Sequence, residues 1–238
     1  MAKASLNRLI YEKLEEQVLS IQEQLTRPVF LQYAELLKMH HDGRVIFSDS
    51  EDIESILSEK ANDIGAQNEF AAFMDAHQVD IKQAVHYLKQ ELRECFSEEA
   101  ARQQFKKSGA VSFSYDWYFH YDSGINFFKD IFSYPIILEP RYLNHELPPD
   151  HYDAFAKGPD FSPVWPDCSE LIERTDLDGD LLNLGSQLMN FYQYQSRLFL
   201  HLALREMDEA GELSFIQKDP FIFYIAEHDS EEMTLYVV

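Results

Sequence analysis

The stretch VSFSYDWYFHY, residues 111–121, carries the strongest β-strand pattern in the chain. Its odd-numbered positions, from Val111 to Tyr121, are all apolar or aromatic, whereas its even-numbered positions are mostly polar. Because successive side chains of a strand point to opposite faces, this alternation predicts a strand with one buried and one solvated face. We expect Asp-Ser-Gly at residues 122–124 to form the turn that follows it.

Further strands are expected C-terminal to this stretch. Residues 133–139 (SYPIILE) predict a strand, and Pro135 places it at a sheet edge because proline cannot donate to the ladder. Residues 220–226 and 232–238 predict a closing hairpin. Residues 125–132 (INFFKDIF) fit either a helical turn or a returning strand, and the helical turn is the preferred interpretation.

Between these strands the sequence changes character twice. Six prolines between residues 140 and 168 predict a long connection with little regular structure. Apolar side chains then recur every three or four residues over 180–210, which predicts a long helix, and Gly211 is a natural end for it.

The first 108 residues predict a succession of helices. Apolar positions such as Leu6, Leu9, Ile10 and Leu14 recur at the spacing of one helical face. Capping residues and breaks at proline and glycine mark where such helices begin and end. Helices are therefore expected at 5–25, 29–40, 50–60, 66–76, 79–95 and about 98–107. The last of them is expected to have Ser97 as its N-cap.

These elements together predict an α+β fold. A helical N-terminal part, residues 1–108, is expected to pack on a small antiparallel or mixed β-sheet, formed by residues 109–238 and crossed by the long helix. The two parts are expected to form either two domains or one shared core.

The charge is the most informative feature of the composition. The 238 residues hold 42 acids and 20 bases, a net charge of −22. Residues 111–238 alone hold 23 acids and 7 bases. Nucleic acid and anionic membrane surfaces are therefore disfavoured as partners, and a basic protein is favoured.

Cellular location is predicted only by what the sequence lacks. The first residues, MAKASLNRLIYEKLEEQ, contain no apolar signal-peptide core, and no uncharged run reaches about 18 residues. The two cysteines, Cys95 and Cys168, are far apart in the sequence and are expected to be free thiols. These features predict a cytoplasmic protein.

Motifs for cofactors and metals are missing. The glycines are isolated, so no phosphate-binding loop can be drawn, and no HExxH or CxxC pattern occurs. The run Asp176–Asp180 lacks the glycine and the glutamate that an EF-hand calcium loop needs. Adjacent His40 and His41 point in different directions on a helix. We expect no cofactor and no metal, with the His145 and His151 loop as the alternative metal site.

One pair of residues suits acid–base chemistry. His120 and Asp122 lie two apart on the predicted strand, so their side chains share a face. No partner nucleophile can be named, because no serine has the G-x-S-x-G context. A small hydrolase-like or ligand-binding domain that uses this pair is therefore the alternative interpretation, and the chain is expected not to be an enzyme.

Aromatic and acidic residues concentrate in the same half of the chain. Residues 111–238 hold 24 of the 33 aromatic residues. Aromatic side chains framed by acids are typical of interfaces, as in the small acidic immunity and inhibitor proteins of bacteria. The sequence predicts a non-enzymatic protein that binds a basic protein, with these contact residues: Asp116, Tyr118, Asp150, Asp153, Asp160, Trp165 and Asp167.

Overall fold

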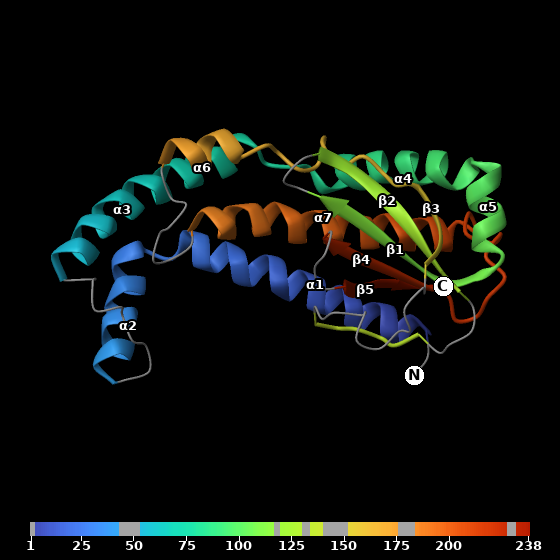
Figure 1. Cartoon of the computed structure of the whole chain (residues 1–238), viewed down its shortest axis with the longest axis horizontal. Coiled ribbons are helices and arrows are strands. Elements are labelled where there is room, and N and C mark those ends of the chain that lie inside the picture. Colours follow the sequence, from blue (N-terminus) through green and yellow to red (C-terminus); the bar gives the residue numbers. More distant parts are fainter. Residues whose placement is uncertain are drawn as a thin grey trace. The chain divides into compact units, whose positions relative to one another are not determined.

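A computed structural model of the chain describes residues 3–42, 53–116, 120–129, 134–139, 152–175, 184–227 and 232–238. Within these residues it has seven helices and one five-stranded mixed sheet (Figure 1), so the predicted α+β class is confirmed. The helices are α1 Lys3–Thr26, α2 Val29–His41, α3 Ile53–Ala76, α4 Ile81–Ser97, α5 Glu99–Phe105, α6 Ser169–Thr175 and α7 Leu184–Glu209. The strands are β1 Ser108–Asp116, β2 His120–Lys129, β3 Tyr152–Lys157, β4 Ile222–Glu227 and β5 Glu232–Val237.

The sheet has the strand order β3-β2-β1-β4-β5. Strand β1 is its centre and pairs with β4 in parallel, whereas the other neighbours are antiparallel. The second face of β1 is also covered at Ser112, which has no exposed surface although the alternation predicted a solvated face there. The prediction of that solvated face is therefore wrong at Ser112.

The hairpin at the centre of the sheet reverses earlier than predicted. Strand β1 ends at Asp116, whose Cα pairs with that of His120 at the start of β2. Residues 122–124 are part of β2, where Ser123 pairs with Tyr115. The predicted turn at 122–124 is therefore wrong. So is the helical turn preferred at residues 125–132, because β2 continues to Lys129.

Two other expectations in this half are corrected. Residues 134–139 form no strand, and Ile137 instead exchanges two hydrogen bonds with Thr234 of β5, one of them through the threonine hydroxyl. The stretch predicted as an irregular connection contains strand β3 at Tyr152–Lys157, which pairs with the edge of β2.

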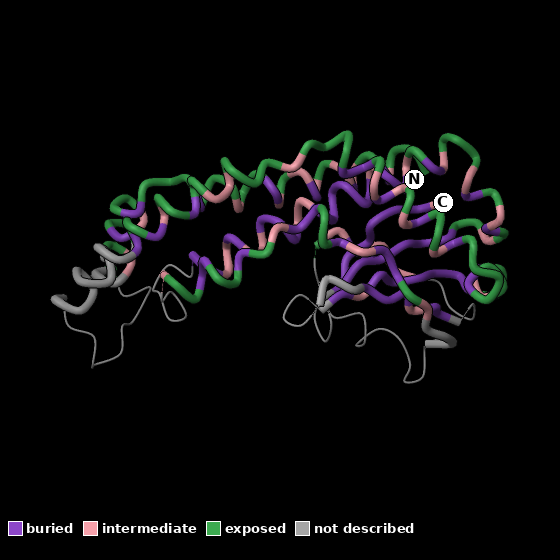
Figure 2. The backbone as a smooth tube through the Cα atoms, turned by 90° about the horizontal axis from the view of Figure 1, so that it is seen from above, coloured by how far each residue is buried: buried purple, intermediate pink, exposed green. Residues whose placement is uncertain are grey.

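The two faces of the sheet are covered differently. Phe113, Tyr115 and Phe223 lie on the face that meets α4 and the C-terminal part of α7, as the contacts of Phe96 with Phe223 and of Arg197 with Tyr115 show. On the other face, Tyr224 donates a hydrogen bond to the carbonyl of Pro135. The described residues of β1, β2, β4 and β5 are consequently mostly buried (Figure 2).

The long helix and most of the short ones occur where they were predicted. Helix α7 is followed by Gly211, which has a φ of +73°. The amides of Gly211 and Glu212 donate to the carbonyls of Asp208 and Met207, the pattern of a Schellman cap. Helix α3 is continuous through Gly65, where two helices were expected, and α6 was not predicted.

The cap predicted for α5 is wrong. Ser97 is the last residue of α4, and its hydroxyl donates to the carbonyl of Glu94. The N-cap of α5 is Glu98, whose side chain makes no capping hydrogen bond. At the other end of α4, Asp80 is a true N-cap, since its carboxylate accepts from the amide of Gln83 at 2.8 Å.

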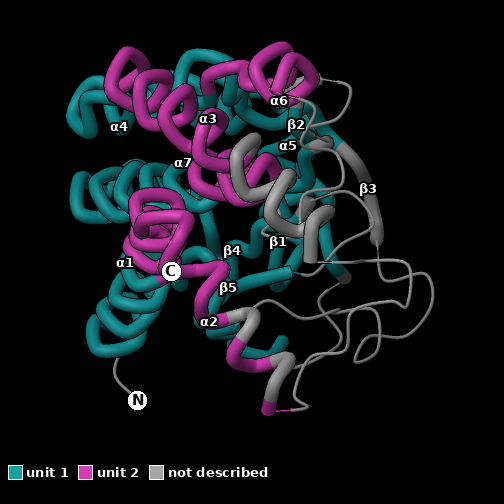
Figure 3. The backbone as a smooth tube through the Cα atoms, turned by 90° about the vertical axis from the view of Figure 1, so that its left-hand side faces the viewer, with its two compact units in different colours: residues 1–16, 79–165, 194–238 teal, residues 17–78, 166–193 magenta. Residues whose placement is uncertain are grey.

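The chain divides into two compact units (Figure 3). Unit 1 contains residues 1–16, 79–165 and 194–238, with the whole sheet, α4 and α5. Unit 2 contains residues 17–78 and 166–193 and is helical in its described residues. Each unit takes residues from both sides of residue 108, and each has its own aromatic contacts, such as Phe105 on Phe127 in unit 1 and Phe73 on Tyr192 in unit 2.

Candidate functional site

Helix α4 in unit 1 carries a row of acidic side chains. Tyr87, Glu91 and Glu94 are spaced by three or four residues and therefore lie along one side of the helix, and Glu98 follows directly after its last residue. The buried side of α4 is made by other residues, among them Leu88, Leu92 and Phe96, so the acidic side is left toward solvent.

Asp160, which follows β3, lies against this row. Its amide donates a hydrogen bond to the carboxylate of Glu91 at 3.1 Å. Its own carboxylate accepts from the amide and the hydroxyl of Ser162, at 2.8 and 3.0 Å. Together, Tyr87, Glu91, Glu94, Glu98 and Asp160 form a surface that we name the acidic stripe.

The pKa values of two side chains on this side of α4 are raised, in part by its negative potential. Burial raises the pKa of the half-buried Tyr87 phenol, and the carboxylates of Asp160 and Glu91 raise it further. Burial likewise raises the pKa of the Cys95 thiol to about 11, with added effects from Glu91 and Glu98. Cys95 is therefore a neutral thiol at pH 7 and a poor nucleophile.

The cations of α4 do not neutralise the stripe. Lys89 and Arg93 lie on another side of the helix, where they pair with Glu206 and Glu212 at 3.0 and 2.6 Å. Arg93 uses both Nε and a terminal nitrogen, which makes this pair bidentate. Among the residues that the structure describes, no salt bridge involves a carboxylate of the acidic stripe.

The predicted contact residues have different surroundings. Asp160 belongs to the acidic stripe. Asp167 of unit 2 is exposed, and its carboxylate accepts from the amide of Ser169 at the start of α6. Trp165 is only 4% exposed and packs edge-on against Tyr115, with 5.3 Å between ring centroids. Trp165 is therefore part of the core of unit 1.

The other predicted site residues can be placed only in part. Asp116 and Asp153 lie in β1 and β3, and His120 and Asp122 lie in β2, but their side chains fall outside the description. Tyr118, Asp150, His145 and His151 lie outside the described residues. The acid–base pair of His120 and Asp122 therefore stays a prediction.

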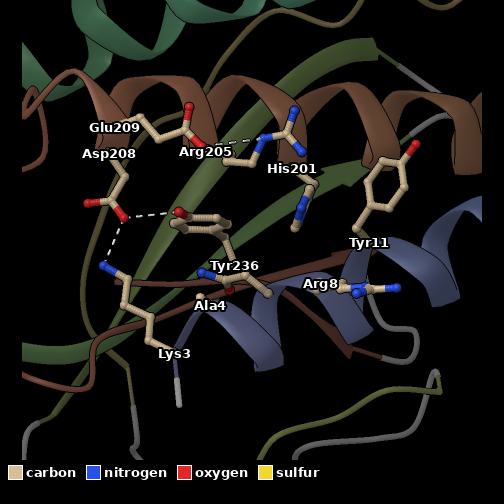
Figure 4. A pocket seen from close by; sticks show the side chains of 10 residues that line it. Lys3, Ala4, Arg8, Tyr11, His201, Arg205, Asp208, Glu209 and Tyr236 are labelled. Carbon is tan, nitrogen blue, oxygen red and sulfur yellow. Dashed lines mark hydrogen bonds and ion pairs between the residues drawn. The ribbon is translucent and has the colours of Figure 1, made fainter.

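A second candidate site in unit 1 is a cavity of about 400 Å³ between the start of α1, the end of α7 and β5 (Figure 4). Three rings line it. His201 lies between Tyr11 and Tyr236, with centroid separations of 5.9 and 5.4 Å. Asn7 holds α1 at this place, because its side-chain amide exchanges two hydrogen bonds with the backbone of Val237, at 2.8 and 2.9 Å.

His201 is the unusual residue of this cavity. It has no exposed surface, and its Nδ1 lies 2.7 Å from the carbonyl oxygen of Leu235. A carbonyl oxygen can only accept, so the proton is on Nδ1 and Nε2 carries a lone pair. Burial lowers the pKa of the imidazole to about 4, which keeps it neutral at pH 7. No described residue donates a hydrogen bond to Nε2.

Charged groups surround these rings. Asp208 accepts from Lys3 at 2.8 Å and from the hydroxyl of Tyr236 at 2.9 Å. Arg205 pairs with Glu209 at the longer distance of 4.0 Å. Sequence analysis missed this site because its residues come from both ends of the chain, and only the sheet and α7 bring them together.

Comparison with known proteins adds no further assignment. The chain matches no protein-family model, and neither a curated protein nor a solved structure is significantly similar to it.

None of the described helices combines the length and the low charge that crossing a bilayer requires. Within the described ranges, no three histidine, cysteine or acidic side chains come together in a way that could hold a metal ion.

Proposed function

We propose that the chain is a non-enzymatic binding protein that holds a basic protein partner on the acidic stripe of unit 1. The observation that carries this proposal is the set of carboxylates on α4, at Glu98 and at Asp160. Those of Glu91, Glu94 and Asp160 lie close to the half-buried Tyr87, and none of the set forms a salt bridge within the described residues. The net charge of −22 adds a long-range attraction for the same partner.

The physical argument has two parts. Complementary charge accelerates the encounter of two proteins and sets their orientation, although it contributes less to affinity. A tyrosine at the centre of an interface supplies contact area at a low cost in conformational entropy. The stripe offers both, because Tyr87 lies among the carboxylates rather than apart from them.

The partner is expected to present lysine and arginine side chains. The two free cysteines, of which Cys168 is buried and Cys95 half-buried, suit a reducing compartment, and we propose the cytoplasm as the place of binding.

The test compares two charge-matched variants in affinity capture followed by mass spectrometry. One variant carries Glu91→Gln, Glu94→Gln and Glu98→Gln in the stripe. The control carries Glu23→Gln, Glu170→Gln and Glu173→Gln, which remove three exposed carboxylates of unit 2. We expect the wild type and the control to retain a basic protein at low salt and the stripe variant to lose it.

Two further measurements complete this experiment. Raising the ionic strength from about 0.05 to about 0.5 M should weaken the captured complex by slowing association. Tyr87→Ala should instead accelerate dissociation. Equal capture of a basic protein by the stripe variant and the control would contradict the proposal.

A further inference from the structure

The cavity beside His201 carries a positive lining in a strongly negative protein. Lys3, Arg8 and Arg205 line it together with two carboxylates, Asp208 and Glu209, which leaves one net positive charge. Its volume of about 400 Å³ lies within the range of small-molecule sites. A local reversal of charge favours a small anion and is unsuited to the basic partner of the acidic stripe.

Arg205 is the cation of this cavity with the weakest protein partner. Lys3 is held by Asp208 at 2.8 Å, and Arg8 by Glu12 at 2.8 Å. Among the described residues, Arg205 forms an ion pair with Glu209 alone, at 4.0 Å. The pKa values of Tyr11 and Tyr236 are raised overall, by the hydrogen bond to Glu15 and by burial respectively, and burial lowers that of His201. The charge of Arg205 acts on all three groups in the lowering direction, so the guanidinium lies near all three rings.

His201 supplies the second recognition element. Its Nε2 is a buried acceptor for which the described residues offer no donor, and buried polar atoms of native proteins are normally satisfied. Figure 4 shows the ring projecting from α7 toward α1, between Tyr11 and Tyr236. Because His201 has no exposed surface, a side chain of the lining must move aside when a donor reaches Nε2.

We propose that this cavity binds a small planar carboxylate that carries an O–H or N–H donor at its opposite end. The carboxylate pairs with Arg205, whose guanidinium presents a matching fork of donors. The donor makes a hydrogen bond to Nε2 of His201, and the planar body packs against the tyrosine rings that flank this histidine. A single negative charge matches the net charge of the lining, whereas a phosphate dianion exceeds it.

Three probes separate the two recognition elements. 4-Hydroxybenzoate has both the carboxylate and the donor, benzoate has only the carboxylate, and phenol has only the donor. Calorimetric titration of the full chain should show 4-hydroxybenzoate binding at least about tenfold more tightly than either of the others. With ¹⁵N-labelled histidine, phenol and 4-hydroxybenzoate should shift the Nε2 resonance of His201, and benzoate should leave it in place.

Variants assign the contacts. Arg205→Gln should reduce the affinity for 4-hydroxybenzoate to that for phenol, whereas Arg27→Gln, which removes an exposed arginine of unit 2, should change neither affinity. His201→Phe should abolish the advantage of 4-hydroxybenzoate over benzoate. If His201→Phe does not fold, the comparison of Arg205→Gln with Arg27→Gln still tests whether Arg205 binds the carboxylate.

Three results would overturn the inference. They are the absence of 4-hydroxybenzoate binding at about 10 mM, equal affinities for the three probes, and an Arg205→Gln variant that binds 4-hydroxybenzoate as the wild type does. None of these results bears on the acidic stripe, because no residue of the cavity belongs to it.

Discussion

Single residues determine two local features of this fold. Gly211 adopts a φ of +73° at the end of α7, a conformation that side chains disfavour, and no atom lies within 4 Å of the position where a Cβ would be. A Cβ at Gly65 would likewise have no atom within 4 Å, but Gly65 lies in the middle of α3. The same substitution therefore has opposite consequences at these two glycines.

We predict that Gly211→Ala lowers the free energy of unfolding by about 1–2 kcal/mol, because alanine is strained at positive φ. Gly65→Ala should raise it by about 0.5–1 kcal/mol, because alanine loses less conformational entropy in a helix. Urea denaturation of both variants measures the difference. A neutral result at Gly211 would show that the end of α7 rearranges at no cost.

The buried imidazole of His201 makes stability depend on pH. Its pKa is lowered by burial from 6.5 to about 4 in the folded chain. Between these values the unfolded chain binds a proton that the folded chain does not, so stability is complete above pH 6.5 and decreases as the pH falls toward 4. The loss attributable to this residue is about 3 kcal/mol.

We therefore predict that His201→Gln flattens the decrease of the unfolding free energy between pH 6.5 and 4, even if the variant is less stable at pH 7. His86→Gln, which removes an exposed imidazole of α4, serves as the control and should leave the wild-type slope in place. Chemical denaturation at a series of pH values gives both slopes. If the slope of His201→Gln matches the control, the imidazole titrates normally in the folded state.

At the scale of elements, sequence periodicity predicted the helices better than the strands. Helices α1, α2, α4 and α7 occur within a few residues of their predicted bounds, because one buried face repeats along each of them. The pattern of 111–121 located the centre of the sheet but not the reversal before His120, since both strands of the hairpin continue the same alternation. The residues of β3, YDAFAK, show no regular alternation of apolar and polar side chains, and the pairing of β3 with β2 decides its structure.

The candidate sites show the same limit. The spacing of Glu91, Glu94 and Glu98 is visible in the sequence, but the approach of Asp160 depends on where β3 joins the sheet. Trp165 was predicted as a contact residue because it is an aromatic residue in an acidic loop, and no local signal reveals that Tyr115 packs against it. Contacts between residues distant in sequence were therefore the unpredictable part of both sites.

The junction of β2 and β3 provides a test at this scale. The amide of Gly158 donates to the carbonyl of Ser123 at 2.7 Å, and the hydroxyl of Ser123 donates to the carbonyl of Pro159 at 2.6 Å. A Cβ at position 158 would collide with the hydroxyl of Ser123 and lie 3.0 Å from its carbonyl atoms.

We predict that Gly158→Ala destabilises the chain by about 1–3 kcal/mol, the usual cost of overpacking. Adding Ser123→Ala should recover only part of the loss, because the backbone of residue 123 stays in the way. Thermal unfolding of the single and double variants measures both effects. Full recovery in the double variant would mean that only the hydroxyl obstructs the methyl group.

For the whole molecule, charge is the dominant property. With 42 acids against 20 bases, most carboxylates have no cation to pair with, and their mutual repulsion opposes the compact state. The salt bridges that do form in the described residues, such as Arg93 with Glu212, are consequently too few to offset the excess of negative charge.

We predict that the free energy of unfolding increases when sodium chloride is raised from about 0.05 to about 0.5 M, because salt screens this repulsion. The variant with Glu23→Gln, Glu170→Gln and Glu173→Gln should be more stable at low salt and should respond less to salt. Denaturation midpoints at each salt concentration measure the trend. A decrease of stability with salt would mean that attractive ion pairs outweigh the repulsion.

The parallel pairing of β1 with β4 has a consequence for synthesis on the ribosome. Strand β1 and its neighbour β2 leave the exit tunnel long before Ile222–Glu227, so one edge of the central strand stays bare while residues 130–221 are added. Bare edges next to large aromatic side chains invite association between nascent chains. We expect this protein to depend on chaperones during translation more than its final stability would suggest.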